Sequence, residues 1–278
     1  MIGGIPFSQF LIAFGFTLVA GLSTGIGSAI ALLSKRTSLR FLSIALGFSA
    51  GVMIYVSMID LFPSALASLT EAYGQRTGAF ATAAAFFGGM VLAALIDRLV
   101  PSIDNPHEVK RIEAMADAGS VHPAQKDHLM RVGLMSAIAI GIHNFPEGIA
   151  TFTAGLHETT LGAAIMVAIA IHNIPEGISV SVPVYFATGS RRKAFRLSFL
   201  SGLSEPIGAL VGFAFLAPFL SVATMGVVFA SIAGIMVFIS LDELLPTARE
   251  YGNAHLAIYG LIAGMAVIAG SLLLFLVK

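Results

Sequence analysis

The chain contains no cysteine, and charged residues are scarce. Without cysteine it can form no disulfide and offers no thiolate, so a transition metal would have to be held by imidazole, carboxylate, amide or thioether groups. Only 11% of the 278 residues are charged, against roughly 25% in soluble domains, whereas 57% are hydrophobic. This composition predicts an integral membrane protein whose main partner is the lipid bilayer.

The lack of net charge and of a phosphate-binding loop gives no reason to expect nucleic acids or nucleotides as partners. The formal net charge is zero, so nothing in the composition favours a nucleic-acid partner. No Walker-type phosphate loop occurs, so neither a bound nucleotide nor ATP hydrolysis is expected. The short, neutral N-terminus also lacks the basic region of a cleaved signal peptide, which favours a retained first helix.

Eight apolar segments approach the ~20 residues that cross a bilayer as a helix. These predicted spans are residues 8–33, 41–63, 78–100, 131–153, 161–186, 195–217, 223–246 and 256–277. They leave little room for a soluble domain, so residues 1–278 are expected to form one all-α transmembrane domain. The long polar connection, residues 101–130, is predicted to be a cytoplasmic loop. Its histidines, His107, His122 and His128, either sequester metal or are plain solvated side chains.

The lysines and arginines are distributed unevenly between the two ends of the predicted spans. Thirteen of the fifteen flank the connections that follow odd-numbered spans, and only Arg76 and Lys278 fall on the other side. Because basic residues are enriched on the cytoplasmic side, the odd connections are predicted to be cytoplasmic and both termini external.

The sequence repeats itself in three places. Residues 50–65 align without gaps to residues 233–248, residues 21–27 resemble residues 202–208, and residues 139–150 match residues 168–179. The predicted topology makes the related spans run in opposite directions, which is typical of inverted repeats in secondary transporters. We therefore expect eight helices in a 3+2+3 order, with spans one to three and six to eight as inverted repeats around a central kinked pair, spans four and five.

The repeated central motif carries ionisable side chains at membrane depth. It reads His143-Asn144-Phe145-Pro146-Glu147-Gly148 in span four and His172-Asn173-Ile174-Pro175-Glu176-Gly177 in span five. On a helix the glutamate lies on the same face as the histidine and the asparagine before it, so it can bridge two adjacent metal positions. Each proline removes a backbone donor, which predicts a kinked, interrupted helix that lines a cavity.

Brought together, the two copies would supply His143, His172, Glu147 and Glu176, and Glu205 in span six could complete an oxygen-rich position. Imidazoles with carboxylates suit zinc, iron, manganese or cobalt better than calcium or magnesium. The alternative is that the histidines and asparagines only form hydrogen bonds between helices, with the glutamates protonated.

Other residues suggest a route to such a site. Asp60 is placed near the outer end of span two, and Asp97, Asp242 and Glu243 towards the cytoplasmic ends of spans three and seven. Each could equally be a solvated helix end, and Asp97 could pair with Arg98. Met53 is either ordinary packing or a soft ligand.

The chain resembles the ZIP (Zrt/Irt-like) family of metal transporters, especially its bacterial members, over essentially all eight spans. The resemblance is carried by HNFPEG in span four, by HNIPEG in span five with the following VPVYFATGSRRKA, and by SGLSEP in span six. It implies import of divalent transition metals into the cytosol across a bacterial inner membrane. Zn²⁺ would be the first substrate, with Fe²⁺, Mn²⁺, Co²⁺ and Cd²⁺ as further ones.

The resemblance also implies a binuclear site near the middle of the membrane. Its nitrogen-richer position would use His143, Glu147, His172 and Glu176, with Met53 on a looser alignment; its second position would use Asn144, Glu147, Asn173, Glu176 and Glu205. Family members vary at His172 and between Asn and Asp beside it. Asp60 stands where several eukaryotic relatives have histidine, which keeps a metal-attracting group at the entrance.

Our leading hypothesis is a secondary transporter that works by alternating access and has no enzymatic activity. An intramembrane metalloenzyme is a rival, but neither His-Glu-x-x-His nor Glu-x-x-His occurs in the chain. A metal-selective channel is the second rival. The sequence leaves open whether a homodimer forms.

Overall fold

A computed structural model describes residues 5–33, 39–99, 123–219, 221–251 and 254–276. These residues form helices and no β-strand, which confirms an all-α protein. Most of the predicted cytoplasmic loop, including His107 and His122, lies outside the described residues. Residues 123–130, which were also assigned to that loop, instead form the start of a helix; His128 belongs to this stretch.

The helices follow one another through short connections. In order they are α1 (Phe7–Leu33), α2 (Leu39–Val56), the π-helical turn η1 (Ser57–Leu61), α3 (Phe62–Tyr73), α4 (Gln75–Leu99), α6 (Pro123–His157), α7 (Thr159–Thr188), α8 (Arg191–Gly202), α9 (Ser204–Leu216), the 3₁₀ turn η2 (Ala217–Phe219), α10 (Val222–Ile239), the π-helical turn η3 (Ser240–Leu244), α11 (Leu245–Tyr251) and α12 (Ala254–Leu276). Among the described residues, seven helical segments are long and apolar enough to cross a membrane. The motif-bearing α6 is more polar and packs against α7 and α9.

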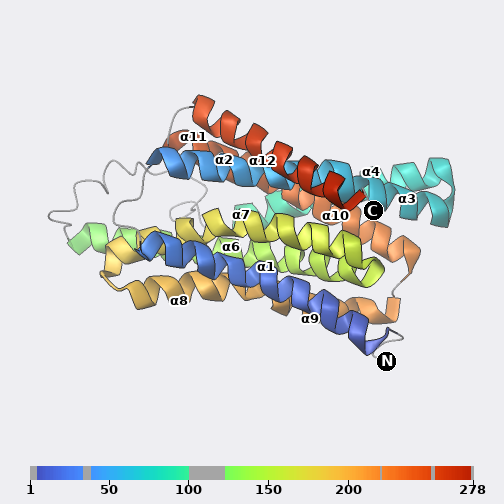
Figure 1. The fold of residues 1–278 in the computed structure, drawn as a ribbon, viewed down its shortest axis with the longest axis horizontal. Coiled ribbons are helices and arrows are strands. Elements are labelled where there is room, and N and C mark those ends of the chain that lie inside the picture. The colour runs from blue at the N-terminus through green and yellow to red at the C-terminus, as the bar shows by residue number, and fades with distance from the viewer. Residues whose placement is uncertain (1–4, 34–38, 100–122, 220, 252–253, 277–278) are drawn as a thin grey trace.

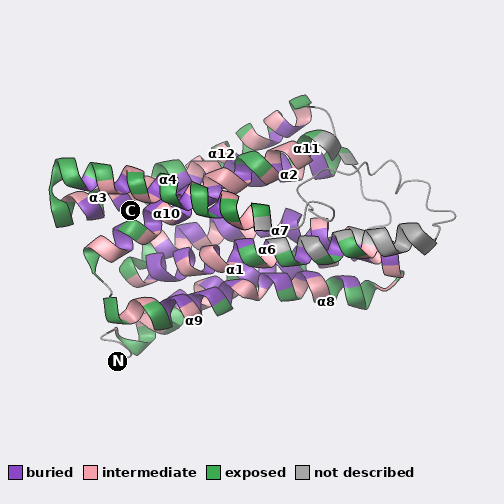
Figure 2. Ribbon diagram, turned by 180° about the vertical axis from the view of Figure 1, so that it is seen from behind, coloured by how far each residue is buried: buried purple, intermediate pink, exposed green. Residues whose placement is uncertain are grey.

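In space the helices sort into two groups, which do not follow the 3+2+3 order of the chain (Figure 1). The site group consists of α1, α6, α7, α8 and α9, and the outer group consists of α2, α3, α4, α10, α11 and α12. The main contact between the groups is made by α2 against α7. Exposed residues lie mainly on outward faces such as those of α3 and α4, where Phe80 and Phe87 are exposed (Figure 2). At membrane depth such apolar faces suit lipid.

Glycines allow helices to approach closely inside each group. A Cβ atom on Gly47 or Gly51 of α2 would lie 2.2 or 2.0 Å from a backbone oxygen of α12, and one on Gly234 of α10 would lie 1.9 Å from the Phe86 oxygen of α4. The site group has equally tight approaches between α1 and α7 and between α6 and α9. Small residues let membrane helices maximise van der Waals contact. Each group is therefore tightly packed internally.

The structure repeats the internal symmetry of the sequence. The two π-helical turns, Ser57–Leu61 and Ser240–Leu244, fall at matching positions of the repeated segment. In both, the serine hydroxyl donates to the carbonyl of the preceding methionine, Met53 or Met236, at 2.7 Å. A π-turn inserts an extra residue into a helix and is found frequently at functional sites. The two repeated segments are therefore alike in backbone structure as well as in sequence.

The interrupted helix lies in another place than predicted. Both α6 and α7 continue as single α-helices through Pro146 and Pro175, whereas the sixth span breaks at Leu203, between α8 and α9. The break comes two residues before Glu205, which therefore lies in the first turn of α9. Prolines are tolerated inside membrane helices when neighbouring groups satisfy the freed carbonyl.

Because α12 packs closely against α2, a glycine-to-alanine change on α12 should affect stability differently at different positions. A Cβ atom on Gly264 would lie 2.1 Å from the Phe48 oxygen, whereas one on Gly270 would meet nothing within 4 Å. We expect Gly264→Ala to destabilise the protein by about 1–3 kcal/mol, because α2 and α12 must separate. Gly270→Ala is the matched control and should melt like the wild type. Equal melting temperatures for the two variants in detergent would contradict this packing.

Candidate metal centre

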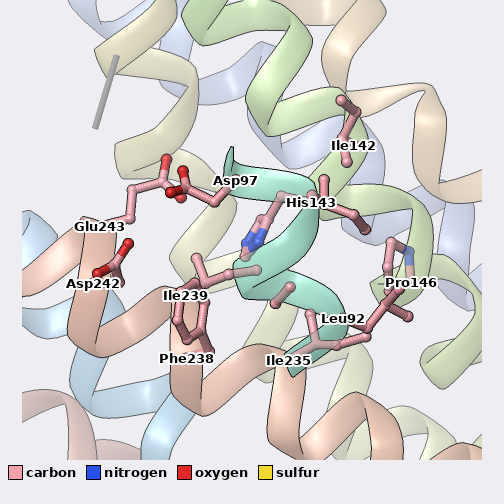
Figure 3. A pocket seen from close by; sticks show the side chains of 12 residues that line it. Leu92, Asp97, Ile142, His143, Pro146, Ile235, Phe238, Ile239, Asp242 and Glu243 are labelled. Carbon is pink, nitrogen blue, oxygen red and sulfur yellow. The ribbon is translucent and has the colours of Figure 1, made fainter. Parts of the chain in front are cut away.

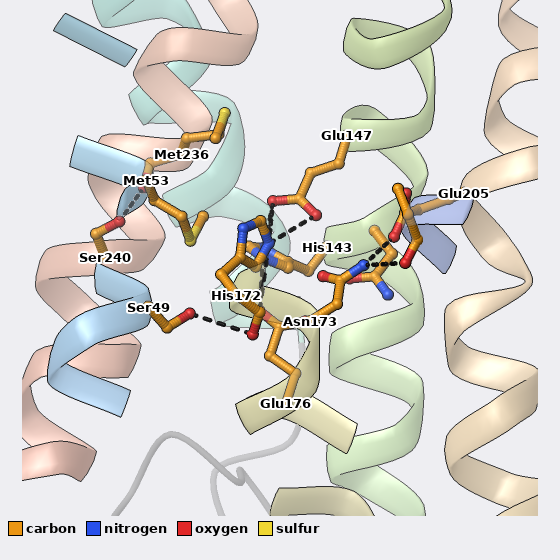
Figure 4. Close-up of polar contacts among 12 residues, drawn as sticks. Ser49, Met53, His143, Glu147, His172, Asn173, Glu176, Glu205, Met236 and Ser240 are labelled. Atoms are coloured by element: carbon orange, nitrogen blue, oxygen red, sulfur yellow. Dashed lines mark hydrogen bonds and ion pairs between the residues drawn. The ribbon is translucent and has the colours of Figure 1, made fainter. Parts of the chain in front are cut away.

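Four side-chain atoms of the repeated motif converge between α6 and α7 (Figure 4). The Nε2 atom of His143 lies 3.2 Å from Glu147 Oε1 and 3.3 Å from Glu176 Oε1. The Nε2 atom of His172 lies 3.2 and 3.8 Å from the same two oxygens. We call these four residues the His–Glu cage. The ligand atoms of His143, His172 and Glu176 all lie within 4.8 Å of one another.

The spacing of these atoms matches a small tetrahedral cation. Zinc binds nitrogen and oxygen ligands at about 2.0–2.2 Å, so the edge of the coordination tetrahedron is about 3.3–3.6 Å. The four nitrogen–oxygen separations, 3.2, 3.3, 3.2 and 3.8 Å, bracket that edge. His172 Nε2 shares a hydrogen bond with Glu147 Oε2 at 3.2 Å, whereas His143 Nε2 and Glu147 Oε1 have no hydrogen-bond partner among the described residues. Glu147 is not among the three residues whose ligand atoms all lie within 4.8 Å of one another, so four-coordinate binding would require its side chain to move.

The cage is shielded from solvent. His143 is 6% exposed, and the other three members are at most 2% exposed. Two ionised carboxylates in such surroundings carry a large desolvation cost unless positive charge is close to them. A divalent cation would balance the two glutamates in full, and neutral imidazoles would complete its coordination.

A second cluster, richer in oxygen, adjoins the cage. Asn173 donates from Nδ2 to Glu205 Oε1 and to the Ala20 carbonyl at 3.0 Å. Glu205 is fully buried, and Glu147 and Glu176 lie within electrostatic range of it. Oxygen ligands from carboxylates and amides suit harder divalent cations and bridge well between two metals.

Asn144 occupies the corresponding place on α6. With its Nδ2 directed to the Ser201 carbonyl at 3.4 Å, its Oδ1 lies 3.3 Å from Glu176 Oε2. Two acceptors at this distance repel unless a cation lies between them or the amide is turned over, in which case Nδ2 donates to Glu176. The sequence-predicted second set, Asn144, Glu147, Asn173, Glu176 and Glu205, is thus brought into one buried region.

The outer group touches the cage through one face of α2. Ser49 donates to the carbonyl of His172 at 3.4 Å, and Met53 follows one turn later (Figure 4). Met53 is fully buried, and its side chain extends towards the His172 ring in this view. Sequence reasoning singled out Met53 but missed Ser49. Ser49 lies four residues before Met53 and therefore on the same face of the helix, and this spacing could have identified it from the sequence.

Three of the predicted route residues line a cavity that also includes His143 (Figure 3). The cavity has a volume of about 80 Å³, and Asp97 from α4 and Asp242 and Glu243 from η3 line it together with apolar side chains. It lies towards the end of the bundle where α4 ends and α11 begins. The structure therefore groups these carboxylates on one side of the cage.

Asp60 lies on the opposite side, in η1. Its Oδ2 atom is buried without a hydrogen-bond partner, and Glu158, at the connection between α6 and α7, lies within electrostatic range. Sequence reasoning treated Glu158 as a plain loop residue, so this neighbour was missed. Only a folded structure brings the two carboxylates together.

Comparison with known sequences agrees with this arrangement. The family model described as ZIP Zinc transporter matches residues 7–272. The chain belongs to the ZIP family. As a ZIP protein it is a multi-pass membrane transporter and not an enzyme.

Several curated bacterial relatives of this ZIP protein are named zinc transporter ZupT. That of Lysinibacillus sphaericus is 59% identical over 265 residues, covering 95% of this chain and 97% of the relative. That of Streptococcus mutans is also 59% identical, over 264 residues with the same coverage. That of Clostridium perfringens is 54% identical over 285 residues, covering 99% of this chain and all of the relative.

The cage geometry predicts a specific loss of metal binding. We expect His172→Ala to weaken zinc binding by at least about tenfold, because one of four converging ligand atoms is removed. The matched control is His255→Ala, since His255 is exposed at the start of α12. Isothermal titration of both purified variants checks this. Unchanged zinc affinity of His172→Ala would remove that residue from the site.

Proposed function

We propose that the protein imports Zn²⁺, and with it related divalent cations, from outside the cell into the cytosol. The main observation behind this proposal is the His–Glu cage, whose four nitrogen–oxygen separations are close to the ligand spacing around zinc and whose two carboxylates match the cation's charge. The relatives that share more than half of their residues with this chain are named zinc transporters, which supports the choice of zinc.

The proposed site is binuclear. The first position consists of the cage with the Met53 thioether beside it, and the second consists of Asn144, Asn173 and Glu205 with the bridging glutamates. Imidazole and thioether groups accept Zn²⁺, Fe²⁺, Co²⁺ and Cd²⁺, whereas the oxygen-rich position also suits Mn²⁺. The bridging carboxylates would couple the two positions electrostatically.

The route we propose runs from Asp60 through the site to the cavity lined by Asp97, Asp242 and Glu243. Both termini of the bundle lie at one end, and α1 ends and α2 begins at the other, as the alternating topology requires (Figure 1). Because the basic connections belong to the second end, that end is assigned to the cytoplasm. The direction we propose is import, as the resemblance to the ZIP family implies, across a bacterial inner membrane with external termini.

Alternating access is proposed to occur by movement between the site group and the outer group. Close backbone approaches at glycines join helices within each group, whereas the α2–α7 contact relies on side chains such as Ser49 and Met53. Side-chain contacts can slide more readily than interlocked backbones. This division replaces the motion suggested by the chain order, in which two helix triplets would move against the central pair.

Uptake by purified protein in liposomes tests the proposal. Glu147→Ala should reduce uptake of zinc at least about 100-fold, since it removes a ligand shared by both positions and leaves the remaining buried groups without compensation. Glu71→Ala, at an exposed position of α3, is the matched control and should transport normally. Wild-type uptake by Glu147→Ala would refute the site, and absence of uptake by the wild type would refute the function.

The same assay reveals substrate range and proton competition. Uptake of Zn²⁺, Fe²⁺, Mn²⁺, Co²⁺ and Cd²⁺ is compared to define the substrate range. For zinc, the concentration that gives half-maximal uptake should be lower at pH 7.5 than at pH 6, because histidine and glutamate ligands must lose protons to bind metal. Saturation with concentration favours a carrier, whereas single-channel currents would show a channel.

A further inference from the structure

The two halves of the site are related by the internal symmetry, residue by residue. The segment at residues 21–27 of α1 corresponds to residues 202–208, so Thr24 occupies the position that corresponds to Glu205. In the structure the first pair of this alignment, Gly21 and Gly202, face each other: a Cβ atom on either would lie 2.4 or 2.3 Å from the other's oxygen. Equivalent residues that touch lie on the pseudo-two-fold axis.

The contacts around Thr24 reproduce those around Glu205. A Cβ on Gly177 of α7 would lie 1.9 Å from the Thr24 oxygen, and one on Gly148 of α6 would lie 1.9 Å from the Glu205 oxygen. The asparagines repeat the relation, since Asn173 donates to the Ala20 carbonyl and the Asn144 amide faces the Ser201 carbonyl, to which it donates in the orientation that leaves its Oδ1 towards Glu176. Thr24 therefore flanks the site from α1 as Glu205 flanks it from α9.

The Thr24 hydroxyl lacks a partner. Thr24 is fully buried, and its Oγ1 atom forms no hydrogen bond with the described residues. Asn173 Oδ1 and Glu205 Oε2 are likewise buried without partners. A hydroxyl in a helix can usually donate to the carbonyl four residues earlier, but the Ala20 carbonyl already accepts from the Asn173 amide and the Ser23 hydroxyl. A buried polar atom without a partner is energetically unfavourable, so three of them on helices that meet at the site indicate a polar ligand.

We propose that Thr24 is a further substrate-binding residue of the oxygen-rich position, where its hydroxyl holds a water molecule bound to the cation. Threonine is two bonds shorter than glutamate, so from the symmetric position it reaches the cation through a water rather than directly. A buried water needs two to four polar partners, and the unpartnered atoms Thr24 Oγ1, Asn173 Oδ1 and Glu205 Oε2 are the candidates on α1, α7 and α9. This inference rests on the binuclear site proposed above.

Thr24 is uncharged, whereas its symmetry equivalent Glu205 is a carboxylate, and this difference affects the charge balance of the binuclear site. The three carboxylates Glu147, Glu176 and Glu205 carry three negative charges when ionised, whereas two divalent cations carry four positive charges. A fourth carboxylate, at the position of Thr24, would give full neutrality, but the hydroxyl does not. The second cation is therefore held less tightly than the first, which favours its release during transport.

Zinc titration of purified full-length protein, with bound metal counted by mass spectrometry, tests the role of Thr24. The wild type should bind two equivalents, the second more weakly. Thr24→Val keeps the shape but removes the hydroxyl, and should weaken the second equivalent at least about tenfold while leaving the first unchanged. Thr24→Ser should restore binding of the second equivalent.

The matched control is Thr17→Val. Thr17 is buried on the same helix, but its hydroxyl donates to the Phe14 carbonyl at 2.8 Å, so its loss should not alter zinc binding. The metal-free melting temperature shows whether each variant folds, and the rise on adding zinc should be smaller for Thr24→Val alone.

The outcomes separate this inference from the function it depends on. Wild-type affinity for the second equivalent in Thr24→Val, or an equal loss in Thr17→Val, would overturn the role of Thr24. Binding of only one equivalent by the wild type would instead refute the binuclear site itself, and the Thr24 proposal with it.

Discussion

Burial of carboxylates at membrane depth is the constraint on which the rest of the structure depends. Glu147, Glu176 and Glu205 are at most 2% exposed and lie among helices that are otherwise apolar. A bilayer cannot solvate such charges, so they persist only where protons, amides or cations compensate them. The cage and its neighbouring asparagines supply some of that compensation, and in the proposed function the charge of a divalent substrate supplies the remainder. Affinity for the substrate and the cost of the empty site have the same physical origin.

Close backbone contact is what brings the ligands to one point. The glycines that follow each glutamate, Gly148 and Gly177, press α6 against α9 and α7 against α1. Because these contacts involve backbone oxygens, they fix the depth of each ligand along its helix. The site group can thus hold its ligands rigidly while side-chain contacts, including Ser49 on His172, meet the outer group. Rigidity within a group and weaker contact between groups are what a carrier needs.

Much of this was predictable from the sequence, because a duplicated polar motif in apolar surroundings has few structural explanations. The His–Glu cage followed from helical spacing in two related copies. The path of the chain around the cage could not be predicted in this way. A proline predicts a lost backbone hydrogen bond, but not whether neighbouring groups bind the freed carbonyl. In the structure α6 and α7 continue through Pro146 and Pro175, and the break falls at Leu203. Grouping of α1 with the central pair depends on tertiary glycine contacts. Thr24 carries no signal by itself and emerges only when symmetry and an unpartnered hydroxyl are combined.

The most direct measurement of the central claim is the X-ray absorption spectrum of the purified protein loaded with one equivalent of zinc. The account predicts about four nitrogen and oxygen ligands at about 2.0–2.2 Å, with the outer-shell scattering of two imidazoles. The imidazole signal should fall by half in a variant that lacks His143. A shell of oxygens alone, without imidazole scattering, would show that zinc binds elsewhere and would contradict the cage as the substrate site.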